Sequence, residues 1–312
     1  MEQVKRVAIL GAGAMGAFFA VRFHDTPGVT AGVVARGSRY GRLMRDGLVV
    51  NGEAYAIPVI HPDQVEVPAD LIVVALKHHH LLQALPDLKN LVRDGTTILS
   101  VMNGLDSEEM IGAIYGMDKV LYAISVGIDA VRQGNQITFS KPGRHYLGEA
   151  TNAQLSPRVR RVQDAFERAD IPYETPPDML RMLWWKFMIN VGTNQASAVM
   201  RAPYGVFQSS PQARALMETL MQEVIELARA AGVNLVNKDI EDWNTVLDTL
   251  SPQGKTSMLQ DVEAGRKTEV EIFGGKVVEL GKTYGIPTPA NLTVLRIIQV
   301  LEQNQLALSQ SS

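Results

Sequence analysis

The sequence predicts an α/β domain with a doubly wound parallel sheet, followed by an all-α domain. Short apolar runs alternate with helical patterns in the first half of the chain, as in a parallel sheet covered by helices. A glycine-rich loop follows the first apolar run, and from about Asp178 the pattern is helical to the end. Paired prolines at Pro176 and Pro177 end a regular element, so we expect domains at 1–177 and 178–312.

Five short runs of apolar and β-branched residues predict the strands of the first domain. They are Val7–Leu10, Val29–Ala35, Asp70–Ala75, Thr97–Val101 and Val120–Val126. A later antiparallel hairpin region is expected from Gln136–Phe139 and Tyr146–Gly148. The helices of the second domain are expected at Met179–Met200, Pro211–Ala231, Lys238–Leu250, Val262–Tyr284 and Asn291–Asn304.

The composition excludes several classes of protein. The chain has 312 residues, a net charge of −3 and no cysteine, which rules out disulfides, thiolate catalysis and cysteine-ligated metals. This charge gives no electrostatic reason to expect nucleic acid or an anionic membrane as a partner. No apolar run approaches the ~18 residues of a membrane span, and a strand-like segment by Val4 leaves no room for a signal peptide. We therefore expect a cytoplasmic protein.

The loop Gly11-Ala12-Gly13-Ala14-Met15-Gly16 directly follows the first predicted strand and opens a helix. Its G-x-G-x-x-G spacing permits a tight turn, lets the backbone approach a pyrophosphate and allows close packing of helix on strand. The free N–H groups at the helix start then face the phosphates. A purely structural strand–helix turn is the alternative, but the place of the loop in a βαβ series favours a Rossmann-type dinucleotide-binding domain.

The end of the second predicted strand indicates which dinucleotide binds. An acidic side chain there would bond the ribose 2′-hydroxyl of NAD, but the segment Val33–Arg39 contains no carboxylate. The planar, permanently charged guanidinium of Arg36 matches a phosphate. We therefore predict NADP(H) as cofactor, with Ser38 and Arg39 as secondary candidates and solvent-facing loop charges as the alternative.

Two polar residues follow other predicted strands, at the sheet edge where ligands of open α/β sheets bind. Lys77 follows one strand and Asn103 another, and both are placed to meet the nicotinamide half of the cofactor and the substrate. Loop residues without function are equally common in such places. The three consecutive histidines at 78–80 converge poorly on one ion and have no carboxylate cluster nearby, so we predict no metal site.

A helix over Leu183–Asn194 is apolar almost throughout, and Lys186, Asn190 and Asn194, spaced four apart, interrupt it. Each step of four advances about 40° around an α-helix, so these side chains point to one side. An ammonium in apolar surroundings has its pKa pulled down from about 10.4 toward the working pH, which suits a proton donor. A snorkelling lysine beside two surface amides is the alternative.

Together these residues resemble the ketopantoate reductase (2-dehydropantoate 2-reductase) family, over nearly the whole chain. Besides the glycine loop, the resemblance rests on Leu76-Lys77, Asn103-Gly104, Trp185-Lys186 with Asn190 and Asn194, Thr256–Asp261, and Gly265–Glu269. The last two segments are more specific than a glycine loop, because they put polar groups where a core helix needs apolar ones.

The resemblance implies NADPH-dependent reduction of a 2-oxo acid to a 2-hydroxy acid, the family reaction being ketopantoate to D-pantoate in pantothenate biosynthesis. It implies that Lys186 is the general acid for the substrate carbonyl, and that Glu269, near the nicotinamide ribose, helps to position it. Substrate would be bound by Asn103, Lys186, Asn190, Asn194 and, at its carboxylate, Ser257. Cofactor would be bound by the glycine loop, Arg36, Lys77, Asn103, Glu269 and the backbone of Ala130.

Departures from the family pattern, Gly254 and Tyr204 among them, leave the identity of the 2-oxo acid open. Gly254 stands where well-studied members carry an asparagine that contacts substrate. Tyr204 stands where some members carry another such asparagine. The nearest alternative is a 3-hydroxyacid or 6-phosphogluconate-type dehydrogenase of the same architecture, and a more distant one is a non-catalytic NADP(H)-binding sensor. The expected partner is a small-molecule 2-oxo acid, and the all-α domain offers a possible homodimer face.

Overall fold

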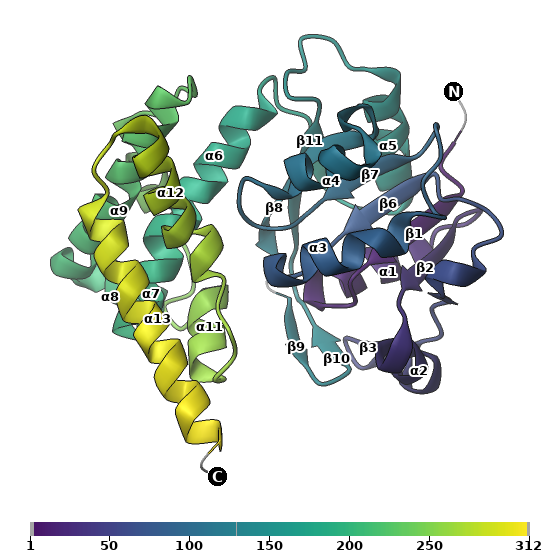
Figure 1. The fold of residues 1–312 in the computed structure, drawn as a ribbon, viewed down its shortest axis with the longest axis horizontal. Helices are drawn as coiled ribbons and strands as arrows, with labels where there is room; N and C mark the ends of the chain where they lie inside the picture. Colours follow the sequence, from purple (N-terminus) through teal and green to yellow (C-terminus); the bar gives the residue numbers. More distant parts are fainter. Residues whose placement is uncertain (1–2, 129, 311–312) are drawn as a thin grey trace. The chain divides into compact units, whose positions relative to one another are not determined.

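The computed structural model describes residues 3–128 and 130–310, apart from the side chains of residue 133 and residues 305–310. The chain divides into two compact units, Met1–Met182 and Leu183–Ser312 (Figure 1). The first is a sheet between helices and the second is helical, so the predicted α/β domain followed by an all-α domain is confirmed.

An eight-stranded sheet runs through the first unit in the order β12-β11-β8-β7-β6-β1-β2-β5. Its strands are β1 Arg6–Leu10, β2 Thr30–Val34, β5 Val59–Ile60, β6 Leu71–Val74, β7 Thr97–Ser100, β8 Val120–Ile128, β11 Pro142–Gly148 and β12 Tyr173–Glu174. Pairing is parallel from β5 through to β8, whereas β11 runs antiparallel to β8. The chain leaves β1 toward β2 and later continues from β6 on the other side of β1, so the strand order reverses between β1 and β6. Ligands of open α/β sheets bind at such a reversal.

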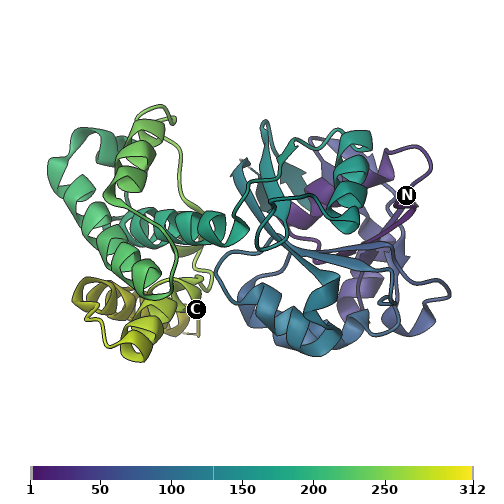
Figure 2. The same cartoon turned by 90° about the horizontal axis from the view of Figure 1, so that it is seen from above.

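Helices cover both faces of this sheet, as Figure 2 shows. α1 (Ala14–His24) and α5 (Pro157–Arg168) lie on one face, and α3 (Leu81–Ala84) and α4 (Ser107–Tyr115) on the other. α1 contributes Phe18, Phe19 and Phe23 to the core, all 0% exposed. Burying three such rings contributes about 1.5–3 kcal/mol each and fixes the helix that the glycine loop opens.

A smaller sheet in the first unit has the order β4-β3-β10-β9. Its strands are β3 Leu48–Val50, β4 Glu53–Tyr55, β9 Val131–Gln133 and β10 Gln136–Thr138, and α2 (Gly37–Asp46) precedes β3. The expected hairpin of 136–139 with 146–148 is wrong: β10 pairs with β9 and β3, and β11 pairs with β8. Alternating apolar runs indicate strands but do not specify partners, which depend on distant segments.

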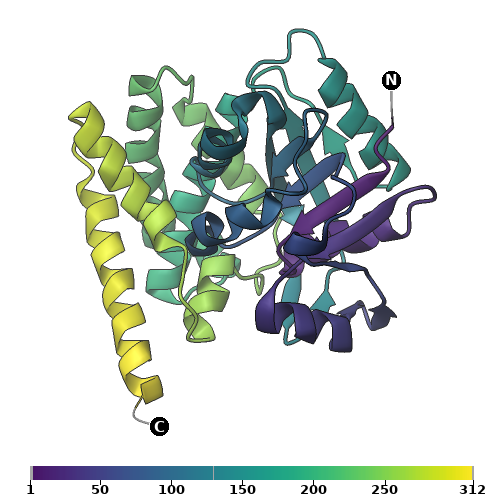
Figure 3. The ribbon, with the colours of Figure 1, turned by 45° about the vertical axis from the view of Figure 1, so that its right-hand side comes forward.

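The second unit packs its helices against one another, with α13 running along α12 and α9 (Figure 3). The helices are α6 Met179–Ile189, which crosses the boundary of the units, α7 Gln195–Met200, α8 Tyr204–Ser209, α9 Pro211–Ala230, α10 Asn237–Leu247, α11 Ser257–Glu263, α12 Gly274–Tyr284 and α13 Pro289–Gln310.

The single helix expected at Val262–Tyr284 is wrong. α11 ends at Glu263, and a 3₁₀ turn, η6 (Val270–Ile272), precedes α12. Gly265 has a φ of 63°, and the N–H of Arg266 donates to the carbonyl of Asp261 at 2.8 Å. This is a glycine-terminated helix end, so Gly265 is the sequence signal from which the break could have been predicted.

Candidate functional site

Four predicted cofactor positions lie side by side at the carboxyl ends of the parallel strands. Across the order β7-β6-β1-β2, Asn103 follows β7, Lys77 follows β6, the glycine loop follows β1 and Arg36 follows β2. Ala130 follows β8, the next strand along, and comes just before β9. Sequence positions 11 to 130 therefore meet at one edge of one sheet, beside the reversal of strand order.

The fold of the glycine loop requires glycine at two of its three glycine positions but not at the third. Gly11 has a φ of 113°, and a Cβ on Gly16 would lie 1.8 Å from the carbonyl oxygen of Gly11. A Cβ on Gly13 would meet no atom of the described chain within 4 Å, and its φ of −73° suits any residue. The missing side chain at Gly13 thus leaves open space where a Rossmann loop admits pyrophosphate, so this cradle fits a dinucleotide.

Arg36, the predicted 2′-phosphate ligand, is already engaged by two carboxylates. Its Nε lies 2.6 Å from Oδ1 of Asp87, and its Nη2 lies 3.4 Å from Oδ1 of Asp63. The Arg36 side chain is 51% exposed, so the remaining donors are accessible. A phosphate binding at Arg36 would meet a guanidinium whose charge is partly offset.

Lys77 places further positive charge at this edge, beside His80. Lys77 precedes the 3₁₀ turn His78–His80, and burial, Arg39 and Lys77, in that order, lower the pKa of His80. An anion bound at this edge would offset the positive charge of Arg39 and Lys77, part of the cause of this lowered pKa. The described part of the chain holds no cluster of three His, Cys, Asp or Glu side chains placed to bind a metal ion.

The predicted proton donor and amides of the second unit lie on one continuous helical segment with a local distortion. α6 carries Lys186, and Asn190–Asn194 forms a π-helical turn before α7. A π-turn advances each residue by less than the α-helical step, so four residues no longer overshoot a full turn. Asn194 is therefore turned back toward the line of Lys186, where a regular helix would carry it further away. The sequence did not predict this turn.

Tight packing against α9 and α10 supports the π-turn. A Cβ on Gly192 would lie 2.4 Å from Cγ of Met221 on α9, so only glycine fits there. Nε1 of Trp243 on α10 donates to Oγ1 of Thr193 at 2.9 Å, and Thr193 is 1% exposed. Turns of this kind are frequent at functional sites, because they re-aim side chains at a cost that the surrounding packing must offset.

Ser257 begins α11, and Glu269 follows that helix in the chain. Ser257 is the exposed first residue of that helix, and its neighbour Thr256 donates from Oγ1 to Oγ of Ser197 on α7 at 3.1 Å. This bond holds the start of α11 against the helix that continues the π-turn. Glu269 is half-buried and comes directly before η6.

Two of the positions that depart from the family pattern, Tyr204 and Gly254, touch each other. The N–H of Tyr204 donates to the carbonyl of Gly254 at 2.9 Å, and a Cβ on Gly254 would lie 2.8 Å from the Tyr204 ring. Burial raises the pKa of the Tyr204 phenol. The ring therefore fills the space that a side chain at 254 would need.

A sheet reversal with a glycine cradle, followed by a helical unit with a lysine–amide face, defines a two-domain dinucleotide-binding protein. The family model described as ketopantoate reductase PanE/ApbA matches residues 7–152, and its C-terminal counterpart matches residues 178–302. The chain belongs to the ketopantoate reductase family, which confirms the resemblance seen in the sequence.

Individual relatives are distant but match along their full length. The chain is 28% identical over 308 residues to a 2-dehydropantoate 2-reductase of Aquifex aeolicus, covering 96% of this chain and 97% of that one. A crystal structure of 2-dehydropantoate 2-reductase from Geobacter metallireducens has a TM-score of 0.83 at 25% identity, covering 96% of this chain and 99% of that one. D-mandelate dehydrogenase with NADH and anilino(oxo)acetate has a TM-score of 0.87 at 21% identity, with coverage of 96% and 99%.

Among residues 3–128 and 130–310, no helix is both long and apolar enough to cross a membrane.

Proposed function

We propose that this chain reduces a 2-oxo acid to a 2-hydroxy acid with NADPH, and that 2-dehydropantoate is its first candidate substrate. The observation that carries the proposal is the face of Lys186, Asn190 and Asn194 on an otherwise apolar, locally π-helical segment, in a chain of this family. The full-length relative named 2-dehydropantoate 2-reductase supports the substrate.

In this proposal each part of the reaction is assigned to a named group. The nicotinamide, when bound, supplies a hydride to C2 of the substrate. The ammonium of Lys186 stabilises the negative charge that develops on the carbonyl oxygen and donates the proton that completes the hydroxyl; the neutral amine then regains a proton from solvent. Ser257, Asn190 and Asn194 hold the substrate carboxylate and hydroxyl groups.

The cofactor in this proposal is held by the first unit and oriented by Glu269. The N–H groups of the glycine loop take the pyrophosphate, because the loop opens α1 and its Gly13 leaves room. Arg36 and Lys77 supply positive charge, and Asn103 and the backbone of Ala130 contact the nicotinamide end.

Initial-rate kinetics test the proposal directly. NADPH and NADH oxidation would be followed with 2-dehydropantoate, 2-oxoisovalerate and pyruvate as substrates. We expect the highest kcat/KM with 2-dehydropantoate and NADPH. NADPH binding without turnover of any 2-oxo acid would contradict the proposal and favour a sensor.

A second candidate is a different 2-oxo acid of the same reaction class. The contact of Tyr204 with Gly254 favours it, because a phenol ring offers fewer hydrogen bonds than amide side chains would. A site built to bond a substrate hydroxyl discriminates strongly against analogues that lack it. The same substrate panel separates the two candidates, since a preference for 2-oxoisovalerate over 2-dehydropantoate would establish the second.

We also propose that the chain forms a homodimer. A neighbouring structure is described as a dimeric ketopantoate reductase from Staphylococcus aureus. Light scattering after size-exclusion chromatography tests this, and a mass near 34.2 kDa would contradict it.

A further inference from the structure

Three arginines of the first unit form a positively charged group, and one of them, Arg132, contacts the glycine loop. Arg132 lies on β9, and Arg39 and Arg42 lie on α2. The Nη1 of Arg132 donates to the carbonyl oxygen of Ala12, inside the loop, across 120 positions of sequence. Its Nε donates to the carbonyl of Gly134 at 2.7 Å. These two bonds fix the guanidinium next to the phosphate loop and leave its other N–H donors for a ligand.

The positive charge of the three guanidinium groups is not offset by an ion pair among the described residues. Burial, then the positive charges of Arg42 and Arg39, lower the pKa of Arg132, and Arg42 and Arg132 line the same cavity. Among residues 3–128 and 130–310, no carboxylate forms an ion pair with these three arginines. Repulsion between like charges in a partly buried place costs free energy that a bound anion would recover.

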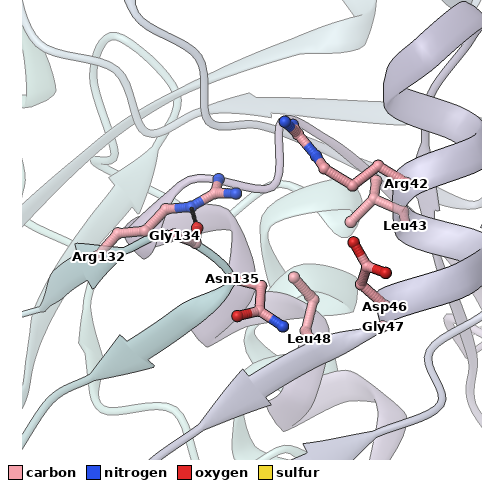
Figure 4. A pocket seen from close by; sticks show the side chains of 8 residues that line it. All are labelled: Arg42, Leu43, Asp46, Gly47, Leu48, Arg132, Gly134 and Asn135. Atoms are coloured by element: carbon pink, nitrogen blue, oxygen red, sulfur yellow. Dashed lines mark hydrogen bonds between the residues drawn. The ribbon is translucent and has the colours of Figure 1, made fainter.

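A cavity of about 290 Å³ lies beside two of these arginines, Arg42 and Arg132. Arg42 and Arg132 line it together with Asp46 and Asn135, and Figure 4 shows both guanidinium groups on the same side of it. The carboxylate of Asp46 also faces this space, but Arg45 bonds both of its oxygens, at 2.7 and 3.0 Å. The net charge that faces a ligand here is therefore positive.

We propose that Arg132, with Arg39 and Arg42, binds the 2′-phosphate of NADP(H) and sets the preference for it over NAD(H). α2 follows β2, the strand whose end lies at the adenosine ribose in this fold. Arg36 alone is a weak phosphate ligand because Asp87 and Asp63 occupy two of its nitrogens. The choice of a dinucleotide as ligand rests on the function proposed above.

Calorimetric titration of the full chain with NADPH and with NADH tests this assignment. Arg132→Gln and Arg42→Gln each remove one positive charge. Arg132→Gln also removes the bond to Ala12 and could disturb the loop, whereas Arg42→Gln leaves that bond intact. Arg160→Gln is the matched control, since Arg160 is exposed on α5. We expect Arg42→Gln and Arg132→Gln to raise the Kd for NADPH roughly 10-fold or more, as for loss of a charge-assisted hydrogen bond, with NADH binding within about twofold for Arg42→Gln.

An unchanged NADPH Kd in both variants would overturn the assignment. So would an equal loss for NADPH and NADH in both, because that result would mean contact with the shared pyrophosphate. The readout requires no substrate, so it is independent of the proposed reaction. If the variants lose affinity for NADPH selectively but the wild-type protein turns over no 2-oxo acid, this inference stands and the proposed function fails. If the wild-type protein turns over substrate with NADPH and neither variant changes NADPH binding, the proposed function stands and this inference fails.

Discussion

The side-chain amide of Gln195 donates a 2.8 Å hydrogen bond to the backbone carbonyl of Val191, within the π-helical turn. The same nitrogen donates to Oδ1 of Asn291 at 2.9 Å, and Nδ2 of Asn291 donates to Glu223 at 2.7 Å. Gln195 and Asn291 are both 0% exposed. Gln195 on α7 is therefore the donor to a carbonyl of the distorted turn, and buried hydrogen bonds link it through Asn291 on α13 to Glu223 on α9.

Replacing Gln195 with alanine should destabilise the protein by roughly 2–4 kcal/mol, because two buried acceptors would lose their donor. Urea unfolding followed by circular dichroism measures this. Gln303→Ala, at an exposed position of α13, is the control and should change the free energy of unfolding by less than about 0.5 kcal/mol. Equal effects of the two substitutions would show that the buried chain of bonds does not support the turn.

Two alanine substitutions in the glycine loop should separate binding from folding. Gly16→Ala should cost about 3 kcal/mol of stability, because its Cβ would overlap a backbone oxygen. Gly13→Ala should cost less than about 1 kcal/mol but raise the Kd for NADPH at least roughly 10-fold, since the methyl group would occupy the space for pyrophosphate. Thermal melts and calorimetric titration measure both quantities. Undiminished NADPH binding by Gly13→Ala would mean that the loop is only a structural turn.

Removing the Lys186 ammonium should affect the chemical step. Lys186→Ala should lower kcat by about 10²–10⁴, while the Kd for NADPH stays within a few-fold. Lys238→Ala serves as control, because Lys238 is exposed on α10 and pairs with Asp242. A near-normal kcat in Lys186→Ala would remove Lys186 as the general acid.

The buried carboxylate of Asp70 should make stability depend on pH. Burial alone would raise the pKa of Asp70, but the N–H groups of Lys5 and Arg6 and the guanidinium groups of Arg93 and Arg161 outweigh burial and lower it. A carboxyl with a lower pKa in the folded state stabilises above its unfolded pKa, near 3.9, and loses this contribution as the pH falls through the folded value.

Asp70→Asn should therefore destabilise the protein by roughly 2–4 kcal/mol at neutral pH, with a difference from wild type that shrinks below about pH 4. Asp242→Asn removes an exposed carboxylate, 59% exposed, and should have little effect at any pH. Denaturant unfolding from pH 3 to 8 tests the expectation. A difference between wild type and Asp70→Asn that stays constant over this range would contradict the linkage.

The sequence alone determined the fold class and the sheet edge that carries the glycine loop, Arg36, Lys77 and Asn103. These features follow from local pattern: apolar periodicity defines strands and helices, and parallel strands bring their carboxyl ends to one edge. The lysine–amide face was also visible, because a spacing of four along a helix is local.

Tertiary structure decided what depends on contacts between distant residues. The π-turn needs Gln195, Asn291 and the close approach of α9 at Gly192, and no pattern within the helix specifies these partners. The bond of Arg132 to Ala12 and the pairing of Arg36 with Asp87 likewise join separate segments. Periodicity reports which face of an element is buried, whereas packing and charge pairing depend on what lies against that face.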